Sequence, residues 1–180
     1  RGNSTHGAGV HPGHVIEVIG VVKAYTTRVG NGPLPTGFGP EMDEKFRELG
    51  GEFGATTGRP RRCGWFDGVL ARFAARVNGL TGLAVTKLDV LDTVPEISIA
   101  TAYRTLSGEV REFPADTWQL AEPEPIYETL PGWEASTREA RSIEELPPAA
   151  RRYLDRIEEL TETPIQMVSV GTRRSQIIRV

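Results

Sequence analysis

The stretch GLAVTKLDV, Gly82 to Val90, decides the fold class of this 180-residue chain. A glycine opens it, three apolar residues follow, and charged Lys87 and Asp89 stand near its end. A short apolar run with a turn residue before it and charge after it is typical of a buried strand in a parallel sheet. Strand and helix patterns alternate on both sides of this run. We therefore expect an α/β protein with a mostly parallel central sheet and flanking helices.

Three segments before this run have helical patterns. Asp67 can cap a helix that continues to about Asn78, and the expected inner face consists of Val69, Leu70, Phe73, Ala74 and Val77. Residues 41–49, EMDEKFREL, predict a short helix that stops at Gly50-Gly51. Residues 13–25, GHVIEVIGVVKAY, follow Pro12 and predict a helix, with a strand as the alternative because β-branched residues are frequent. Residues 26–40 form a long Gly/Pro loop, which favours a functional role.

The chain after this run predicts two further strands, a hairpin and a helix. Residues 96–104, EISIATAYR, read as a strand, and residues 106–113 read as a hairpin that turns at Ser107-Gly108. We expect irregular structure with short helices over residues 114–148. Pro147 and Pro148 open a helix through residue 161, and residues 164–171, PIQMVSVG, form the last strand.

Composition excludes several classes of protein. The net charge is −3 and the isoelectric point is near 5.7, which argues against a nucleic-acid binder. No apolar run approaches the roughly 20 residues that span a bilayer. Cys63 is the single cysteine, so the chain cannot build a disulfide framework, and a reducing cytoplasm is the expected location. His6, His11 and His14 crowd the N-terminal segment, where a polar loop is favoured over a metal site. The N-terminal residues show no signal-peptide pattern and no initiator Met, and we expect either a piece of a larger protein or a processed chain.

An unusual concentration of flexibility and positive charge lies in GATTGRPRRCGWFDG, Gly54 to Gly68. The hydroxyls of Thr56 and Thr57 can hold a carboxylate, and arginine offers planar, bidentate donors to carboxylate or phosphate. Gly54 and Gly58 allow close backbone approach and movement. The loop therefore predicts a small anionic ligand. A solvated arginine-rich turn is the alternative.

Two predicted strand ends carry weaker signals. Thr86 to Asp89, TKLD, resembles the guanine-reading Asn-Lys-x-Asp of GTP-binding proteins, because an aspartate can accept hydrogen bonds from the guanine N1–H and 2-amino group. A Lys-Asp pair that merely ends a strand is the alternative. Val168 to Gly171, VSVG, is another strand end whose backbone could touch a base or ribose. The phosphate-loop pattern G-x-x-x-x-G-K-[ST] is absent from the sequence.

Longer motifs carry a resemblance to a known family. The stretches VGNGPLPT, GATTGRPRRCGWFD, VTKLDVLD, AYR, PIYETLPGW and IEELTETPIQMVSVG occur in the order and spacing of adenylosuccinate synthetases. The resemblance covers essentially all of residues 1–180 and corresponds to the C-terminal portion of one P-loop-like domain, without its N-terminal phosphate-loop half. It implies a cytoplasmic, homodimeric ligase that joins IMP and L-aspartate with GTP hydrolysis and Mg²⁺, giving adenylosuccinate, GDP and phosphate.

The resemblance also implies roles for particular residues. Ala55, Thr56, Thr57, Gly58, Arg59, Pro60 and Arg61 match the mobile L-aspartate loop. Val29 and Arg59 match IMP contacts, and the GTP contacts correspond to Arg61, Lys87, Leu88, Asp89, Ser169, Val170 and Gly171. Pro60 departs from the arginine that is frequent there, and it stiffens the loop locally.

The resemblance places the catalytic acid, the catalytic base and the magnesium ligands upstream, so no catalytic or metal-binding residue is assigned in this chain. We expect the isolated fragment to be inactive. One rival reading is a non-catalytic fragment that binds a nucleotide or dicarboxylate. A weaker rival is a structural domain in which the arginines pair only with acids.

Overall fold

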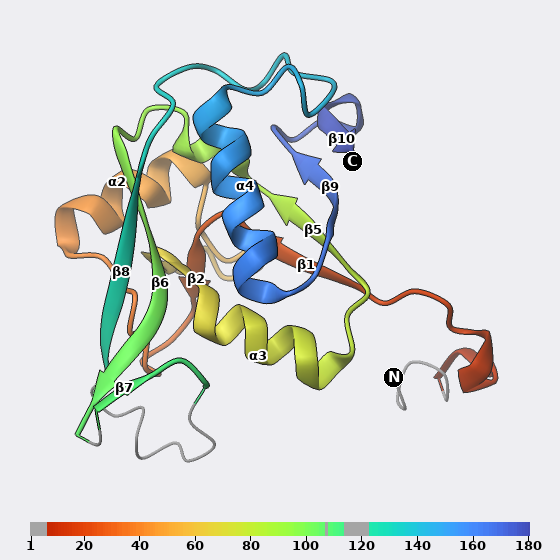
Figure 1. Cartoon of the computed structure of the whole chain (residues 1–180). Coiled ribbons are helices and arrows are strands. Elements are labelled where there is room, and N and C mark those ends of the chain that lie inside the picture. The colour runs from red at the N-terminus through yellow and green to blue at the C-terminus, as the bar shows by residue number, and fades with distance from the viewer. Residues whose placement is uncertain (1–6, 107, 114–122) are drawn as a thin grey trace.

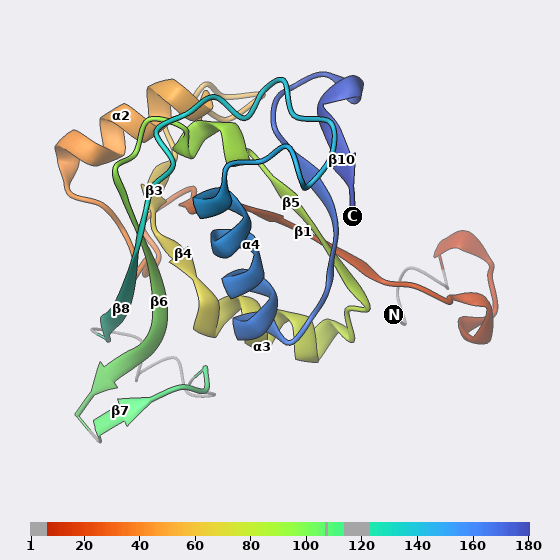
Figure 2. The ribbon, with the colours of Figure 1, turned by 45° about the horizontal axis from the view of Figure 1, so that its top comes forward.

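The computed structural model describes residues 7–106, 108–113 and 123–180. Two four-stranded sheets and three α-helices form one body, from which the N-terminal segment extends (Figure 1). Helix α4 (Pro148–Thr161) covers one side of the first sheet, α3 (Gly68–Asn78) lies along its lower end, and α2 (Pro40–Gly50) packs against β3 (Arg62–Gly64). Figure 2 shows the same arrangement after a rotation.

The first sheet has the strand order β1-β5-β9-β10. Its strands are Ile19–Lys23 (β1), Gly82–Thr86 (β5), Ile165–Ser169 (β9) and Ile177–Arg179 (β10). β5 pairs in parallel with both β1 and β9, and β10 runs antiparallel to β9. Four of the five β5 residues are buried, as its apolar composition predicts. The predicted central parallel strand is confirmed.

The second sheet is largely antiparallel. Its long strand β6 (Glu96–Thr105) pairs with β4 (Phe66–Asp67) in parallel and with β7 (Gly108–Val110) and β8 (Glu124–Pro131) antiparallel. A two-stranded ribbon, β2 (Thr26–Arg28) with β3 (Arg62–Gly64), completes the strands of the described residues. In the predicted hairpin, Gly108 belongs to β7 and pairs with Thr105, while Ser107 lies outside the described residues.

Three helices follow the expected signals. α2 (Pro40–Gly50) has Pro at its start and ends at Gly51, which takes a left-handed conformation with φ 58°. α3 (Gly68–Asn78) is capped by Asp67, whose carboxylate accepts from the Leu70 N–H at 3.0 Å. α4 (Pro148–Thr161) follows Pro147. Short 3₁₀ turns occupy Pro12–His14 (η1), Leu88–Leu91 (η2) and Arg174–Gln176 (η4).

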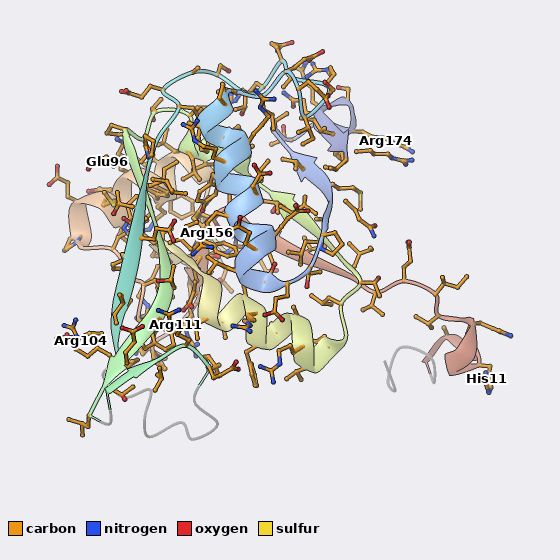
Figure 3. All side chains as sticks on the ribbon, viewed as in Figure 1. His11, Glu96, Arg104, Arg111, Arg156 and Arg174 are labelled. Atoms are coloured by element: carbon orange, nitrogen blue, oxygen red, sulfur yellow. The ribbon has the colours of Figure 1, made fainter. Side chains whose placement is uncertain are left out.

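One hydrophobic core joins both sheets and two of the helices. Its fully buried side chains include Phe46 of α2, Leu83 of β5, Ile97 and Ile99 of β6, and Ile157 of α4. An ion pair adds a surface link, because the Arg156 guanidinium of α4 lies 2.8 Å from the Glu128 carboxylate of β8. Figure 3 labels Arg156 on the ribbon. The sheets and helices therefore stabilise one another.

Several predictions about elements were wrong. Residues 19–23 form strand β1 rather than part of a helix, because their backbone pairs with β5. The irregular structure expected over 114–148 contains strand β8 within its described part. β9 is not the last strand, because β10 follows it.

The expected inner face of α3 was also partly wrong. Val69 is buried, but Leu70, Phe73 and Val77 are 39%, 37% and 67% exposed. The buried side chain near the end of the helix is Ala75. The nearby edge strand β1 exposes Val21 as well. Among the described helices, none has the length and apolar character needed to cross a bilayer.

Candidate functional site

The parallel strands bring their carboxyl ends to one edge of the first sheet. Lys23 ends β1, Lys87 follows β5, and Ser169 ends β9. The register places Lys23 opposite Thr86 and Val85 opposite Val168. Ligands of α/β proteins bind at this edge. The predicted segments TKLD and VSVG, which are far apart in the chain, therefore meet.

The arginine loop is closed at its base by backbone hydrogen bonds. Arg61 N–H donates to the Glu52 carbonyl at 2.9 Å, and Gly54 N–H donates to the Arg59 carbonyl at 2.8 Å. Phe53 and Pro60 form an isolated bridge between these two bonds. Residues 55–60 are exposed, including both threonines and Arg59. Gly58 takes φ 63°, a conformation that favours glycine. The loop therefore has a fixed base and an accessible tip.

A buried carboxylate connects this loop to the strand ends. Glu52 is 0% exposed, and its oxygens lie 2.7 Å from Lys23 Nζ, 2.8 Å from Arg61 Nη1 and 3.3 Å from Lys87 Nζ. The Tyr25 hydroxyl donates to the same carboxylate at 2.6 Å. We call these five residues the Glu52 cluster. It joins the end of β1, the base of the loop and the residue that follows β5.

Protonation equilibria in the Glu52 cluster are strongly shifted. Burial disfavours the charged carboxylate, but the hydrogen bonds from Lys23, Tyr25 and Arg61 outweigh burial and lower the pKa of Glu52 to about 2. Burial lowers the pKa of Lys23, although its contact with Glu52 acts in the opposite direction. Burial and the hydrogen bond to Glu52 raise the pKa of Tyr25. Glu52 is therefore an ionised acceptor at neutral pH, and Tyr25 is a neutral donor.

Lys87 has an unusual backbone that turns the chain directly after β5. Its φ of 61° and ψ of 35° lie in the left-handed region, which non-glycine residues rarely adopt. The ammonium donates to the Gly50 carbonyl at the end of α2 in addition to contacting Glu52. The turn starts η2, which carries Leu88 and Asp89. Leu88 is buried in the core, and the Asp89 side chain is 10% exposed.

Asp89 and Gly171 line one cavity of about 310 Å³ at this edge. The other lining residues are Arg138, Glu139, Thr172, Arg173 and Gln176. The volume is at the lower end of the range for small-molecule pockets. Arg138 Nη2 lies 3.2 Å from the Asp89 carboxylate, so this ion pair forms part of the cavity wall. The structure thus brings the two predicted base-contacting segments to a single hollow.

The segment that carries Arg138 is held by another acid. Asp92, just after η2, accepts hydrogen bonds from Trp133 Nε1 at 2.9 Å, Thr137 N–H at 2.8 Å and the Thr137 hydroxyl at 2.9 Å. Gln176 donates to the Arg138 carbonyl at 3.3 Å. Two hydrogen bonds order the cavity wall that follows β9. Val170 N–H donates to the Gln176 carbonyl at 2.9 Å, and the Ser169 hydroxyl donates to the Gly171 carbonyl at 2.8 Å.

Val29 and Arg59 lie outside both the Glu52 cluster and the cavity lined by Asp89. Val29 is 54% exposed and follows β2, whose Arg28 pairs with Arg62 at the end of the arginine loop. Arg59 is exposed at the loop tip, where its N–H lies 3.5 Å from the Thr57 hydroxyl. Neither side chain lies in the Glu52 cluster or lines the Asp89 cavity. Both are accessible to a ligand that approaches the loop.

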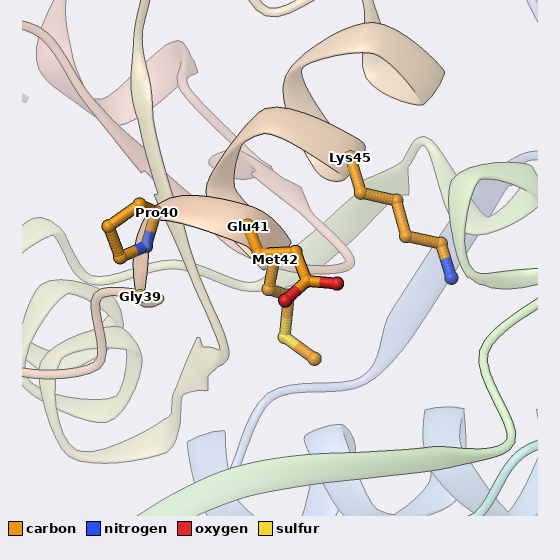
Figure 4. Close-up of a pocket in the computed structure, with 5 residues that line it drawn as sticks. All are labelled: Gly39, Pro40, Glu41, Met42 and Lys45. Carbon is orange, nitrogen blue, oxygen red and sulfur yellow. The ribbon is translucent and has the colours of Figure 1, made fainter.

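A larger hollow of about 530 Å³ lies beside the start of α2, but none of the predicted site residues lines it. Figure 4 shows its lining residues Gly39, Pro40, Glu41, Met42 and Lys45. Their side chains lie on a single helical turn and the loop before it. We therefore do not take this hollow as the functional site.

The described residues contain no cluster of three or more His, Cys, Asp or Glu side chains suited to a metal. His11 and His14 lie with ring centroids 5.7 Å apart, and the His11 Nδ1 accepts a hydrogen bond from Gly13 N–H. His6 lies outside the described residues.

Sequence reasoning missed Glu52 and Arg138. Glu52 stands between a helix-ending glycine pair and the loop, where a glutamate resembles an ordinary surface residue. Arg138 lies in the stretch for which irregular structure with short helices was expected. The sequence carries no specific signal for either residue.

Comparisons with known proteins identify the family of this chain. A sequence model described as adenylosuccinate synthetase matches residues 1–178. An adenylosuccinate synthetase of Carboxydothermus hydrogenoformans is 59% identical over 172 residues, which are 96% of this chain and 40% of that protein. That of Gloeobacter violaceus is 54% identical over 98% of this chain and 40% of its own length.

A solved structure is similar along the entire chain. The structure of fully ligated adenylosuccinate synthetase from Plasmodium falciparum superposes with a TM-score of 0.94 at 36% identity. The match covers 100% of this chain and 43% of the other. The chain therefore spans about two fifths of the length of the proteins it matches.

Proposed function

Because the chain belongs to the adenylosuccinate synthetase family, we propose that it provides the GTP- and L-aspartate-binding part of a ligase. The reaction joins IMP and L-aspartate with hydrolysis of GTP and gives adenylosuccinate, GDP and phosphate. In this proposal residues 1–180 are the C-terminal portion of a single domain. The complete enzyme is a cytoplasmic homodimer whose acid, base and magnesium ligands lie in other parts of the protein.

The Asp89 cavity is the proposed guanine site. The Asp89 carboxylate accepts hydrogen bonds from guanine N1–H and the 2-amino group. At the neighbouring carboxyl end of β9, the base is contacted by Ser169, Val170 and Gly171. Lys87 and Leu88 complete this contact segment. The proposal is supported by one observation above all, the shared cavity of Asp89 and Gly171, two residues from segments about 80 positions apart.

The arginine loop is the proposed site for L-aspartate. Thr56 and Thr57 offer hydroxyl and backbone donors to a carboxylate, and Arg59 offers a planar fork. Ala55, Gly58 and Pro60 shape the loop between them. Arg59 and Val29 also contact IMP in this proposal, and Arg61 contacts GTP. The exposure of residues 55–60 supports a loop that can close over a ligand.

These residues bind and orient the substrates, and we assign no proton transfer to them. Arginines near transferring phosphate stabilise charge that develops in the transition state. Mg²⁺ would neutralise phosphate charge when it is bound with GTP. Since the described residues offer no ligand cluster for it, we route no step through a metal held by this chain.

The test of this function is the change Asp89→Asn in the full-length synthetase that contains these residues. Asparagine replaces one acceptor with an amide donor, so one guanine donor loses its partner. We expect kcat/KM for GTP to fall, by an amount that corresponds to a loss of roughly 1.5–3 kcal/mol in transition-state stabilisation. We expect kcat/KM for XTP, the xanthine nucleotide, to rise. The measurement is kcat/KM for both nucleotides.

The matched control is Asp155→Asn, which makes the same chemical change on an exposed position of α4. It should leave the GTP/XTP ratio unchanged. If Asp89→Asn also leaves this ratio unchanged, Asp89 does not read the base and the proposed guanine site is wrong. A melting curve separates loss of specificity from loss of folded protein.

A further inference from the structure

Glu52 is a buried charge that the binding roles above do not use. Its carboxylate is 0% exposed, and it is surrounded by donors from three separate segments of the chain. An ionised carboxylate is costly to bury unless it is fully paired. Because Glu52 is not exposed to solvent, its charge does not serve to keep the protein surface soluble. The contacts it makes therefore indicate its role.

Two of its partners are residues of the proposed nucleotide site. Arg61 Nη1 lies 2.8 Å from Glu52 Oε2, and Lys87 Nζ lies 3.3 Å from Oε1. Arg61 lies at the base of the arginine loop, and Lys87 follows β5. Two further donors also contact the carboxylate: Lys23 Nζ lies 2.7 Å from Oε2, and the Tyr25 hydroxyl lies 2.6 Å from Oε1. One carboxylate thus fixes two long, flexible side chains from different segments.

We propose that Glu52 is the positioning residue of this site: it sets Arg61 and Lys87 jointly, so that the arginine loop and the end of β5 act as one unit. The inference rests on the proposed function, in which both cations contact GTP. Glu52 itself touches no substrate in this proposal.

Charge in the cluster is consistent with this role. Three cations surround one carboxylate, which leaves a net charge of three minus one, or +2. The side chains of Lys23, Arg61 and Lys87 are 23%, 27% and 34% exposed, so each remains partly open to an incoming anion. Arginine has five N–H donors, and the hydrogen bond from Arg61 Nη1 to Glu52 uses one of them. Glu52 therefore orders the cations without neutralising them.

Backbone bonding at the same place links Glu52 to the loop. Arg61 N–H donates to the Glu52 carbonyl, so main chain and side chain of the same two residues both bond at the loop base. Gly54 N–H and Gly58 N–H make the next bonds inside the loop, to the Arg59 and Gly54 carbonyls. Loss of the carboxylate should loosen this base as well as free the two cations.

The test compares Glu52→Gln with Asp67→Asn in the full-length synthetase. Both changes turn a buried, hydrogen-bonded carboxylate into the isosteric amide, and Asp67 caps α3 and accepts from the Tyr103 hydroxyl without contacting Glu52, Arg61 or Lys87 in the hydrogen bonds of the described residues. Hydrogen exchange without nucleotide follows the amides of Gly54, Gly58 and Arg61, and calorimetry gives the Kd for GDP. We expect Glu52→Gln to raise the hydrogen-exchange rates of these loop amides at least about tenfold and to raise the Kd for GDP roughly tenfold to a hundredfold. We expect neither change in Asp67→Asn.

The outcomes separate this inference from the proposed function. Loop exchange and GDP affinity in Glu52→Gln that match those of Asp67→Asn would overturn the inference. If the wild type does not bind GDP, or Asp89→Asn does not alter binding, the proposed function fails, and the exchange data alone decide whether Glu52 orders the loop.

A variant that keeps the charge covers the case in which Glu52→Gln does not fold. Glu52→Asp withdraws the carboxylate by one methylene from Arg61 and Lys87 but still balances the cations. The same faster exchange of the loop amides supports the positioning role, and exchange at the wild-type rate overturns it.

Discussion

At the scale of single residues, the site depends on acids that hold basic side chains in place. Glu52 holds Arg61 and Lys87, and Asp92 orders the segment that brings Arg138 to Asp89. Arginine and lysine lose considerable side-chain entropy when they are fixed. Buried or half-buried acceptors reduce that cost before a ligand arrives. The cationic side chains are therefore preorganised in the absence of a ligand.

Glu52 should make the stability of the protein depend on acid pH. Its pKa falls from 4.5 to about 2 on folding, so its stabilisation is fully present above pH 4.5 and is lost as the pH falls towards 2. A shift of this size corresponds to about 3 kcal/mol at neutral pH. Glu52→Gln should therefore be less stable at pH 7 and lose less stability on acidification. Urea unfolding at several pH values measures this, and parallel pH curves for the two proteins would contradict it.

At the scale of elements, local signals predicted the ends of helices better than the faces they bury. Asp67 and Gly51 bound α3 and α2 as expected, because caps depend on neighbouring backbone groups. The apolar stripe of Leu70, Phe73 and Val77 looks the same in sequence whether it meets a core or solvent. Tertiary packing decided between them: it buried Val69, as predicted, together with Ala75, which was not predicted.

Strands were harder to predict where pairing rather than composition defines them. Residues 19–23 have apolar residues compatible with a helix or a strand, and pairing with β5 selects the strand. β8 contains a proline near each end, and prolines are not typical of strands. β10 has only three residues, which is too few to show a periodic pattern. The arginine loop was recognised from its own glycines and arginines, whereas TKLD and VSVG carry weak local signals and became candidates through the family resemblance. Their convergence required the parallel register, and their individual ligand roles remain predictions.

Gly132, at the end of β8, should not tolerate a side chain. A Cβ there would lie 1.8 Å from the Val94 carbonyl oxygen, and the neighbouring atoms belong to backbone that cannot easily move. Gly132 N–H also donates to the Pro95 carbonyl at 2.7 Å. We expect Gly132→Ala to lower the free energy of unfolding by about 1–3 kcal/mol. Chemical denaturation checks this against Gly7→Ala, whose Cβ meets no atom within 4 Å, and equal stability of both variants would refute it.

At the scale of the whole molecule, the two sheets share one core and should open together. Leu83 and Val85 of β5 lie in the same buried cluster as Ile97 and Ile99 of β6. We therefore expect the slowest amides of β5 and β6 to have opening free energies within about 1 kcal/mol of each other. Native-state hydrogen exchange measures both values. A gap of several kcal/mol would show two separately unfolding units.

The single cysteine has a practical consequence for following motion of the arginine loop. Cys63 is 1% exposed in β3, and burial together with nearby Asp43 raises the pKa of its thiol to about 11. Since the thiolate is the reactive species, this side chain is nearly inert towards maleimides at neutral pH while the protein is folded. A cysteine introduced at exposed Ala55 would therefore take a fluorophore or spin label selectively, without first removing the native thiol.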